Sequence, residues 1–199
     1  MTLDATFKYG RRTLDYCTDA YNHARHNERA VEVPVGLAFL RKHEKDTLEI
    51  GAVLPHYLPW DDPAYPRHTV VDLREDFPGV LNVNALEWEP ERQYKRVIAI
   101  STLEHFGGHR AFLTALERLK SWTAPGGLLY VTIPAQCNET FWIKPAVIDS
   151  LGMDVRRFDK VRPQANGWAE IRPHNRRAQL HYGQPTPWAN TVYLLEWKP

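Results

Sequence analysis

The sequence is poor in cysteine, because only Cys17 and Cys137 occur among its 199 residues. Two cysteines so far apart exclude a small scaffold built on disulfides, and reduced thiols are typical of the cytoplasm, where we expect the protein to act. The sequence also lacks a run of about eighteen apolar residues, so we expect no membrane span. Residues 1–12 are mixed polar and lack the apolar centre of a signal peptide.

An excess of charge of either sign is also missing. The 25 basic and 24 acidic side chains give a formal net charge of +1. Such a balance supplies no global basic field, so we do not expect a nucleic-acid partner unless a local basic groove forms. Basic residues do gather at 156–162 and 172–177. We expect these to form a solvated face, and the alternative is a site for a phosphate-bearing acceptor.

The order of elements predicts an α/β fold. Residues 1–28 are polar and aromatic, and we interpret them as an N-terminal lid or helical segment preceding a single α/β domain of residues 29–199. In that domain, helical patterns at 29–43 and 109–122 are interspersed with apolar strand patterns at 46–50, 68–73, 80–83, 96–101, 128–133, 153–161 and 191–197. This alternation predicts a Rossmann-like, doubly wound, mostly parallel seven-stranded sheet with helices on both faces.

Residues 162–188 interrupt this regular pattern. They are rich in Pro, Gly, Asn and His and lie between the last two expected strands. We expect a long loop there, and loops of that length are often functional.

Polar residues and glycine follow the first two expected strands. In open parallel sheets, ligands bind beyond the carboxyl ends of the strands. Glu49 and Gly51 end the first strand, where the acid can accept a hydrogen bond from a ligand ammonium and the glycine permits a tight turn. Asp72 ends the second strand, where a carboxylate can bind both hydroxyls of a ribose. The alternative for Asp72 is that it caps a turn.

The third and fourth strands also end in residues suited to a site. Asn84 and Ala85 follow the third strand and offer an amide and a backbone donor that could read an adenine edge. Ser101 and Thr102 follow the fourth strand and lead to His105, facing the centre of the expected site.

Four motifs in this order resemble the class I S-adenosylmethionine-dependent methyltransferases. They are LEIG at 48–51, VVD at 70–72, ISTLEHFG at 100–107 and PGGLLYVTIP at 125–134. Within that superfamily the chain is similar to a small bacterial branch whose first loop reads GxVLxHY, here residues 51–57. The resemblance implies S-adenosylmethionine as cofactor and methyl transfer as reaction, and it implies no particular acceptor.

The resemblance also implies a role for each residue at the strand ends. Glu49 and Gly51 would lie at the methionine end of the cofactor, Asp72 would hold the ribose, Asn84 and Ala85 would contact adenine, Ser101 and Thr102 would pass beside the sulfonium, and His105 would lie near the acceptor.

Three positions depart from the family pattern. Val53 stands where the first loop usually carries a second glycine, Pro55 alters the helix that should follow, and Asn84 replaces a common carboxylate. A Cβ at Val53 would crowd a close approach to the backbone. This departure motivates an alternative function, a catalytically inactive module that binds S-adenosylmethionine or a partner.

The expected function is therefore methyl transfer to O or N of a small-molecule acceptor, such as a sugar or a natural-product intermediate. We expect His105 to be the general base, and His174 and His181 are the next candidates for that role. The alternative for His105 is that it caps a helix or satisfies a core carbonyl. We expect no metal, because His105 and His109 are four residues apart without an evident third ligand. The sequence indicates no oligomeric state.

Overall fold

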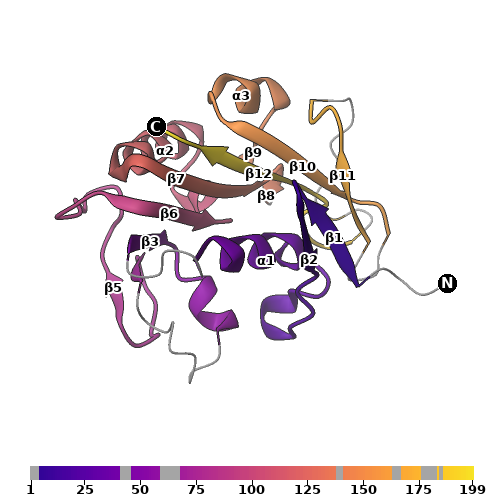
Figure 1. Ribbon diagram of the computed structural model, residues 1–199, viewed down its shortest axis with the longest axis horizontal. Helices are drawn as coiled ribbons and strands as arrows, with labels where there is room; N and C mark the ends of the chain where they lie inside the picture. The colour runs from indigo at the N-terminus through magenta and orange to yellow at the C-terminus, as the bar shows by residue number, and fades with distance from the viewer. Residues whose placement is uncertain are drawn as a thin grey trace.

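The computed structural model describes residues 5–40, 46–58, 68–137, 141–162, 167–175, 183 and 186–199. Their centre is an eight-stranded sheet (Figure 1) with the order β11-β10-β12-β7-β6-β3-β4-β5. Its strands are β3 (Thr47–Ile50), β4 (Thr69–Asp72), β5 (Val80–Asn82), β6 (Tyr94–Ile100), β7 (Thr123–Pro134), β10 (Asp154–Lys160), β11 (Trp168–Ile171) and β12 (Thr191–Trp197). The five strands from β5 to β7 are mutually parallel, and β12, β10 and β11 each pair antiparallel with their neighbours.

The remaining elements are short apart from two helices. They are the strands β1 (Thr6–Tyr9), β2 (Arg12–Asp15), β8 (Gln136–Cys137) and β9 (Phe141–Trp142), the helices α1 (Arg29–Leu40), α2 (His109–Trp122) and α3 (Pro145–Ser150), and the 3₁₀ turns η1 (Tyr21–His23), η3 (Leu54–Tyr57) and η4 (Leu103–His105). Figure 1 shows α1 on one face of the sheet and α2 and α3 on the other. This arrangement confirms the expected Rossmann-like α/β class.

The alternation of side chains along the central strands builds two separate cores. In β6, Val97 and Ala99 belong to the core under α2, whereas Ile98 and Ile100 belong to the core under α1. The same alternation separates Leu129 and Val131 from Leu128 and Tyr130 in β7. Because both faces are covered, these strands consist of almost uninterrupted apolar residues.

Helix α2 has the bounds that its sequence pattern predicts. Its buried side chains are Phe112, Ala115, Leu116, Leu119 and Trp122, spaced so that they form one apolar stripe against the sheet. Full burial of each large side chain in this stripe contributes about 1.5–3 kcal/mol. The helix is stabilised by this stripe rather than by a side-chain cap, because Gly108 provides no side-chain hydrogen bond at the start of the helix.

The sheet has one strand more than the seven expected. The additional strand, β11, lies inside the segment 162–188 that we expected to be a loop, and it pairs antiparallel with β10. Its four residues, Trp168–Ile171, are too few to show a strand pattern among flanking Pro, Gly and Asn. The pairing with β10, rather than a local preference, therefore accounts for this strand.

The N-terminal segment is a β-hairpin of β1 and β2 followed by the single turn η1, so of the two alternatives expected there, a lid or a helical segment, the structure contradicts the helical one. Phe7 packs edge-on against Phe158 of β10 at 5.8 Å between ring centroids. The Tyr16 hydroxyl donates to the backbone oxygen of Trp168 at 3.0 Å. The hairpin thus shares the core of α1 and covers the β10–β11 side of the sheet.

Pro34 lies inside α1. Because proline has no N–H, the carbonyl of Ala30 loses its partner within the helix. That carbonyl accepts instead from the backbone N–H of Cys17 at 3.0 Å. The proline therefore leaves a backbone acceptor that joins the end of the hairpin to α1.

None of the helices in the described ranges combines the length and the apolar character needed to cross a bilayer.

Candidate functional site

A cavity of about 500 Å³ lies at the carboxyl ends of the parallel strands. Its size falls within the range of small-molecule sites. Seven of the eight residues that the sequence singled out line it, namely Gly51, Asp72, Asn84, Ala85, Ser101, Thr102 and His105. Glu49 does not.

Gly51 begins the loop after β3 in a conformation that suits only glycine. Its φ is +83°, and a Cβ built there would lie 2.1 Å from Oγ1 of Thr102. Its N–H donates to the carbonyl of Val71 at 2.8 Å, so the turn is attached to β4 as well. The backbone at Gly51 and the side chain of Thr102 therefore form one closely packed wall of the cavity.

Glu49 is directed into the protein rather than into the cavity. Its Oε1 accepts the backbone N–H groups of Val53 and Leu54 at 2.9 and 2.7 Å, and its Oε2 lies 2.9 Å from Nε2 of His68. The side chains of Glu49 and His68 are fully buried. This placement corrects the expectation that the carboxylate faces a ligand, and it makes Glu49 the residue that holds the first loop.

The same contacts account for the unusual first loop. The N–H groups of Val53 and Leu54 point inward at Glu49, and Pro55 lies in the first turn of η3, where a missing N–H costs nothing. Val53 lines the cavity. A second glycine is therefore not required for this loop to close, and the cavity persists with a valine in its wall.

Asp72 closes a turn, as one interpretation of its sequence position expected, and it also lines the cavity. Its Oδ1 accepts from the backbone N–H of Arg74 at 2.8 Å, which closes a turn, and its Oδ2 accepts from the N–H of Ala52 at 3.1 Å. The side chain is also partly exposed and lines the cavity. Because each carboxylate oxygen can accept a second hydrogen bond, Asp72 retains acceptor capacity toward a ligand.

Asn84 and Ala85 contribute to the wall in different ways. The Asn84 amide donates to Glu87 at 2.9 Å and accepts from the N–H of Leu86 at 3.0 Å, so its polar atoms serve its own turn. Ala85 is buried and lines the cavity beside it. The side of the cavity formed after β5 is therefore mainly apolar.

Ser101 occupies a strained backbone position directly after β6. Its φ is +41°, which is uncommon for a residue other than glycine. The conformation is held by its N–H, which donates to the carbonyl of Thr132 at 3.1 Å, and by its Oγ, which donates to Oε1 of Glu32 at 2.6 Å. Strain of this kind concentrates at functional sites.

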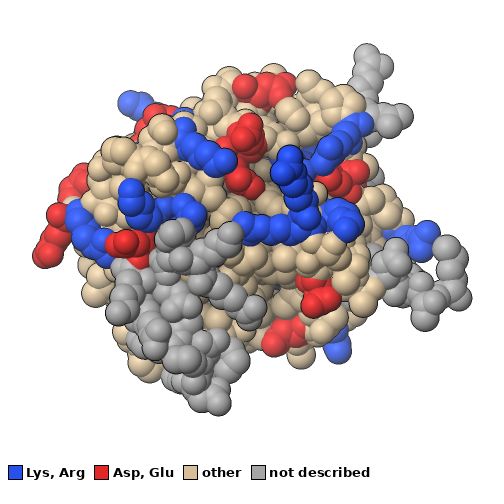
Figure 2. Space-filling view, in the orientation of Figure 1, with Lys and Arg blue, Asp and Glu red and all other residues tan. Residues whose placement is uncertain are grey.

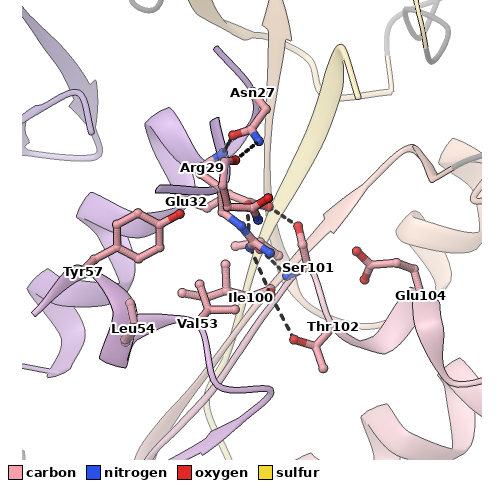
Figure 3. Close-up of polar contacts among 12 residues, drawn as sticks. Asn27, Arg29, Glu32, Val53, Leu54, Tyr57, Ile100, Ser101, Thr102 and Glu104 are labelled. Atoms are coloured by element: carbon pink, nitrogen blue, oxygen red, sulfur yellow. Dashed lines mark hydrogen bonds and ion pairs between the residues drawn. The ribbon is translucent and has the colours of Figure 1, made fainter. Parts of the chain in front are cut away.

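Arg29 is a cavity residue that sequence reasoning missed. Its Nη1 donates to Glu32 and to the carbonyl of Ile100, both at 3.1 Å, and Figure 3 shows the side chain extending from α1 toward Ile100. The guanidinium is buried and lines the cavity, and the Nη2 group donates to no residue in the described part of the chain. Glu32 and Glu28 raise its pKa against the effect of burial, so it is a permanent cation. A charged i,i+3 pair on an otherwise apolar helix was the signal available in the sequence.

Acidic groups surround this arginine. Burial and then Glu32 raise the pKa of Glu28 to about 7. Burial also raises the pKa of Glu104 well above its ordinary value, and Glu32 and Glu28 add to that effect. Three carboxyl groups therefore share the neighbourhood of one guanidinium.

His105 lies at the rim of the cavity. Its side chain is 62% exposed, and its Nε2 lies 3.8 Å from Oε1 of Glu104. Burial of part of the ring, and then Arg29, lower its pKa. The imidazole is therefore neutral at neutral pH and has a nitrogen that can accept a proton or bind a cation.

The other candidate bases do not share this cavity. His174 lies 2.6 Å from Asp149 and lines a different cavity beside β10 and β11. His181 lies outside the described residues, as do Arg176 and Arg177 of the second basic cluster.

Three arginines of the C-terminal third pair with acids, whereas the buried amino group of Lys160 has no hydrogen-bond partner among the described residues. Arg156 and Arg172 both pair with Glu170, and Arg157 pairs with Asp159. On the face shown in Figure 2, Lys and Arg side chains likewise lie beside Asp and Glu. Arg157 and Lys160 are almost fully buried, which corrects the expectation of a solvated face for these two residues, whereas the side chain of Arg172 is exposed.

No family model matches the sequence, and no curated protein matches it. Among solved structures, the N-methyltransferase NodS from Bradyrhizobium japonicum WM9 is similar, with a TM-score of 0.55 at 15% identity over 85% of this chain and 94% of that one. NodS in complex with S-adenosyl-L-homocysteine matches with a TM-score of 0.55 at 16% identity, over 85% of each chain. A SAM-dependent methyltransferase from Archaeoglobus fulgidus matches with a TM-score of 0.50 at 14% identity, over 83% of this chain and 93% of that one. At these identities the similarity shows the fold, which is that of the S-adenosylmethionine-dependent methyltransferases.

Proposed function

We propose that the chain binds S-adenosylmethionine and transfers its methyl group to an oxygen or nitrogen of a small-molecule acceptor. The observation that supports this most directly is the cavity, which places the turn at Gly51, the carboxylate of Asp72 and the guanidinium of Arg29 around one space at the strand ends. The solved complex of NodS with S-adenosyl-L-homocysteine supports the same cofactor class.

The residues present fit this cofactor at three points. Asp72 has acceptor capacity for ribose hydroxyls, and Ala85 offers an apolar surface for adenine. Arg29 suits the methionine carboxylate, because a guanidinium binds carboxylates with two parallel hydrogen bonds.

The chain's contribution to the reaction is positioning and proton transfer. When bound, S-adenosylmethionine supplies an electrophilic methyl carbon. Ser101 and Thr102, held by Glu32 and by the Ile100 carbonyl, form the wall that orients the acceptor. Such positioning can supply about 7–11 kcal/mol. His105 accepts the acceptor's proton, which contributes roughly 10²- to 10⁴-fold in rate.

The acceptor is proposed to be small because Arg156, Arg157 and Arg172, which belong to the basic clusters of the sequence, are paired with acids. A sugar or a natural-product intermediate carries the hydroxyl or amine that this chemistry needs.

A His105→Ala variant tests the assignment of the base. We expect turnover to fall while the affinity for S-adenosyl-L-homocysteine, measured by calorimetry, stays within about twofold. His109→Ala is the matched control, because His109 stacks on Phe141 and does not line the cavity. Equal losses of turnover and affinity in His105→Ala would remove His105 from the chemistry.

A second candidate function is a non-catalytic binding module. Val53 in the cavity wall favours it, because this residue stands where the first loop of the family usually carries a second glycine. Calorimetric titration with S-adenosylmethionine and with S-adenosyl-L-homocysteine separates the two candidates. Binding of either nucleoside together with methyl transfer to a small-molecule library supports the enzyme. Binding without transfer to any amine or hydroxyl supports a module that binds the nucleoside. No binding of either nucleoside contradicts the enzyme and supports a module that binds a partner instead.

A further inference from the structure

Glu104, His105 and Cys137 form a cluster that the sequence does not reveal. One ligand atom from each of the three lies within 4.8 Å of the other two. Glu104 and His105 lie in η4, directly after β6, and Cys137 lies in β8, just beyond the end of β7. Because β6 and β7 are neighbouring parallel strands, their carboxyl ends bring these segments together.

The carboxylate of Glu104 is buried, and one of its two oxygens lacks a hydrogen-bond partner among the described residues. The residue is 5% exposed, and its Oε2 makes no hydrogen bond in the described part of the protein. Leaving a buried acceptor unpaired costs about 1–3 kcal/mol, and more for a charged group. In Figure 3 the carboxylate points from η4 back toward Ser101 rather than out to solvent.

The surrounding charge favours a cation at this point. Glu28, Glu32 and Glu104 are three carboxyl groups near a single guanidinium, that of Arg29. A bound metal ion supplies positive charge to such a group of acids and deprotonates a thiol ligand.

We propose that Glu104, His105 and Cys137 bind a divalent transition-metal ion of the Zn²⁺ type at the edge of the cavity. A thiolate, an imidazole and a carboxylate suit Zn²⁺ and are a poor set for Mg²⁺ or Ca²⁺. Ligand atoms around a tetrahedral ion lie roughly 3–4 Å apart. The Glu104–His105 distance of 3.8 Å already meets this, and the exposed His105 ring can turn to close the remaining gap to Cys137.

Three protein ligands leave a fourth position open, as is usual in catalytic zinc sites. His105 lines the cavity, so the open position faces the space assigned to the acceptor. The inference rests on the proposed function and changes one role in it: with an ion bound, His105 would be a ligand in place of the general base, and the ion would supply positive charge beside the acceptor's oxygen or nitrogen.

Titration of the untagged full chain with Co²⁺ tests the site without an activity assay. A cobalt–thiolate bond gives a charge-transfer absorption band in the near ultraviolet. We expect one Co²⁺ per chain with this band, and displacement of Co²⁺ by Zn²⁺. Cys137→Ser should abolish the band, whereas Cys17→Ser, which removes the other cysteine, should leave it unchanged. Glu104→Gln keeps the side chain's shape and should weaken Zn²⁺ binding by about 100-fold or more, since even outer partners of ligands contribute 10–100-fold.

The same samples are titrated with S-adenosyl-L-homocysteine, so that the two proposals are scored separately. Nucleoside binding without a cobalt band overturns the metal site and leaves the proposed function intact. A Cys137-dependent cobalt band without nucleoside binding supports the site and contradicts the proposed function. A band that persists in Cys137→Ser, or that disappears in Cys17→Ser, also overturns the inference.

Discussion

Replacing Asp72 by alanine gives the sharpest test of how the cavity holds its ligand. The carboxylate accepts the N–H groups of Ala52 and Arg74 and retains acceptor capacity toward the cavity. Its removal therefore affects two quantities that can be measured independently, the stability of the loops and the affinity for the nucleoside.

Each effect has an expected size. Hydrogen bonds from two ribose hydroxyls to a charged acceptor should contribute about 1.5–3 kcal/mol in total. The loss of this contribution weakens S-adenosyl-L-homocysteine binding by about 10- to 150-fold. The two backbone N–H groups lie beside a cavity that water can enter, so the stability cost should be only about 1 kcal/mol. In a chain of this length that lowers the melting temperature by about 2–4 °C.

Two further variants isolate the cause. Asp72→Asn keeps one carbonyl acceptor and loses the charge, so its affinity should lie between those of the wild type and Asp72→Ala. Asp76→Ala removes an exposed acid from the following loop and should leave affinity unchanged. Calorimetry measures the affinity and a thermal melt measures the stability. Wild-type affinity in a folded Asp72→Ala variant would refute the ribose assignment.

Three other predictions concern Gly51 and Arg29 in the cavity wall and the neighbouring acid Glu28. Gly51→Ala should lower the stability by about 2 kcal/mol or more, because its Cβ meets Thr102 at positive φ; thermal melts should show partial recovery in the double variant with Thr102→Ala. Arg29→Gln should lower the free energy of unfolding by about 3–5 kcal/mol, measured by urea denaturation, because it leaves Glu32 buried without its cation. The double variant with Glu32→Gln should recover part of the lost stability. Glu28 has its pKa raised by burial and by Glu32 from the ordinary 4.5 to about 7, so the folded chain binds the extra proton between these pH values. Its contribution to stability is complete below pH 4.5 and is lost as the pH rises through 7. We therefore expect the difference in free energy of unfolding between Glu28→Gln and the wild type to shift by about 1–3 kcal/mol in favour of the variant between pH 5 and pH 8. Denaturation at both pH values measures this difference, and the same difference at both would contradict the raised pKa.

Elements with strong local periodicity are those that the sequence predicted well. The helix at 109–122 appears with the expected bounds because five buried side chains repeat at helical spacing. The strand at 191–197 also appears as expected, since a run of buried apolar residues permits few alternatives. The order of such elements was sufficient to predict the fold class and to place polar residues at the strand ends.

Elements that depend on a partner strand were not predictable in this way. The hairpin at residues 6–15 and the strand β11 are short and half polar. The hairpin is stabilised by the pairing of its two strands and by contacts with residues more than a hundred positions away, and β11 is stabilised by pairing with β10. Local preference is too weak to identify four-residue strands, because their stability comes from tertiary contacts.

By itself the sequence determined which polar groups reach the end of the sheet, since strand ends and side-chain types follow from local pattern. Only the tertiary structure decided what each group faces. Glu49 turns inward because the N–H groups of Val53 and Leu54 and the ring of His68 lie beneath it. Cys137 joins Glu104 and His105 because β6 and β7 are neighbours. A buried polar atom is directed by the nearest available partner, and that partner is set by distance in space rather than along the chain.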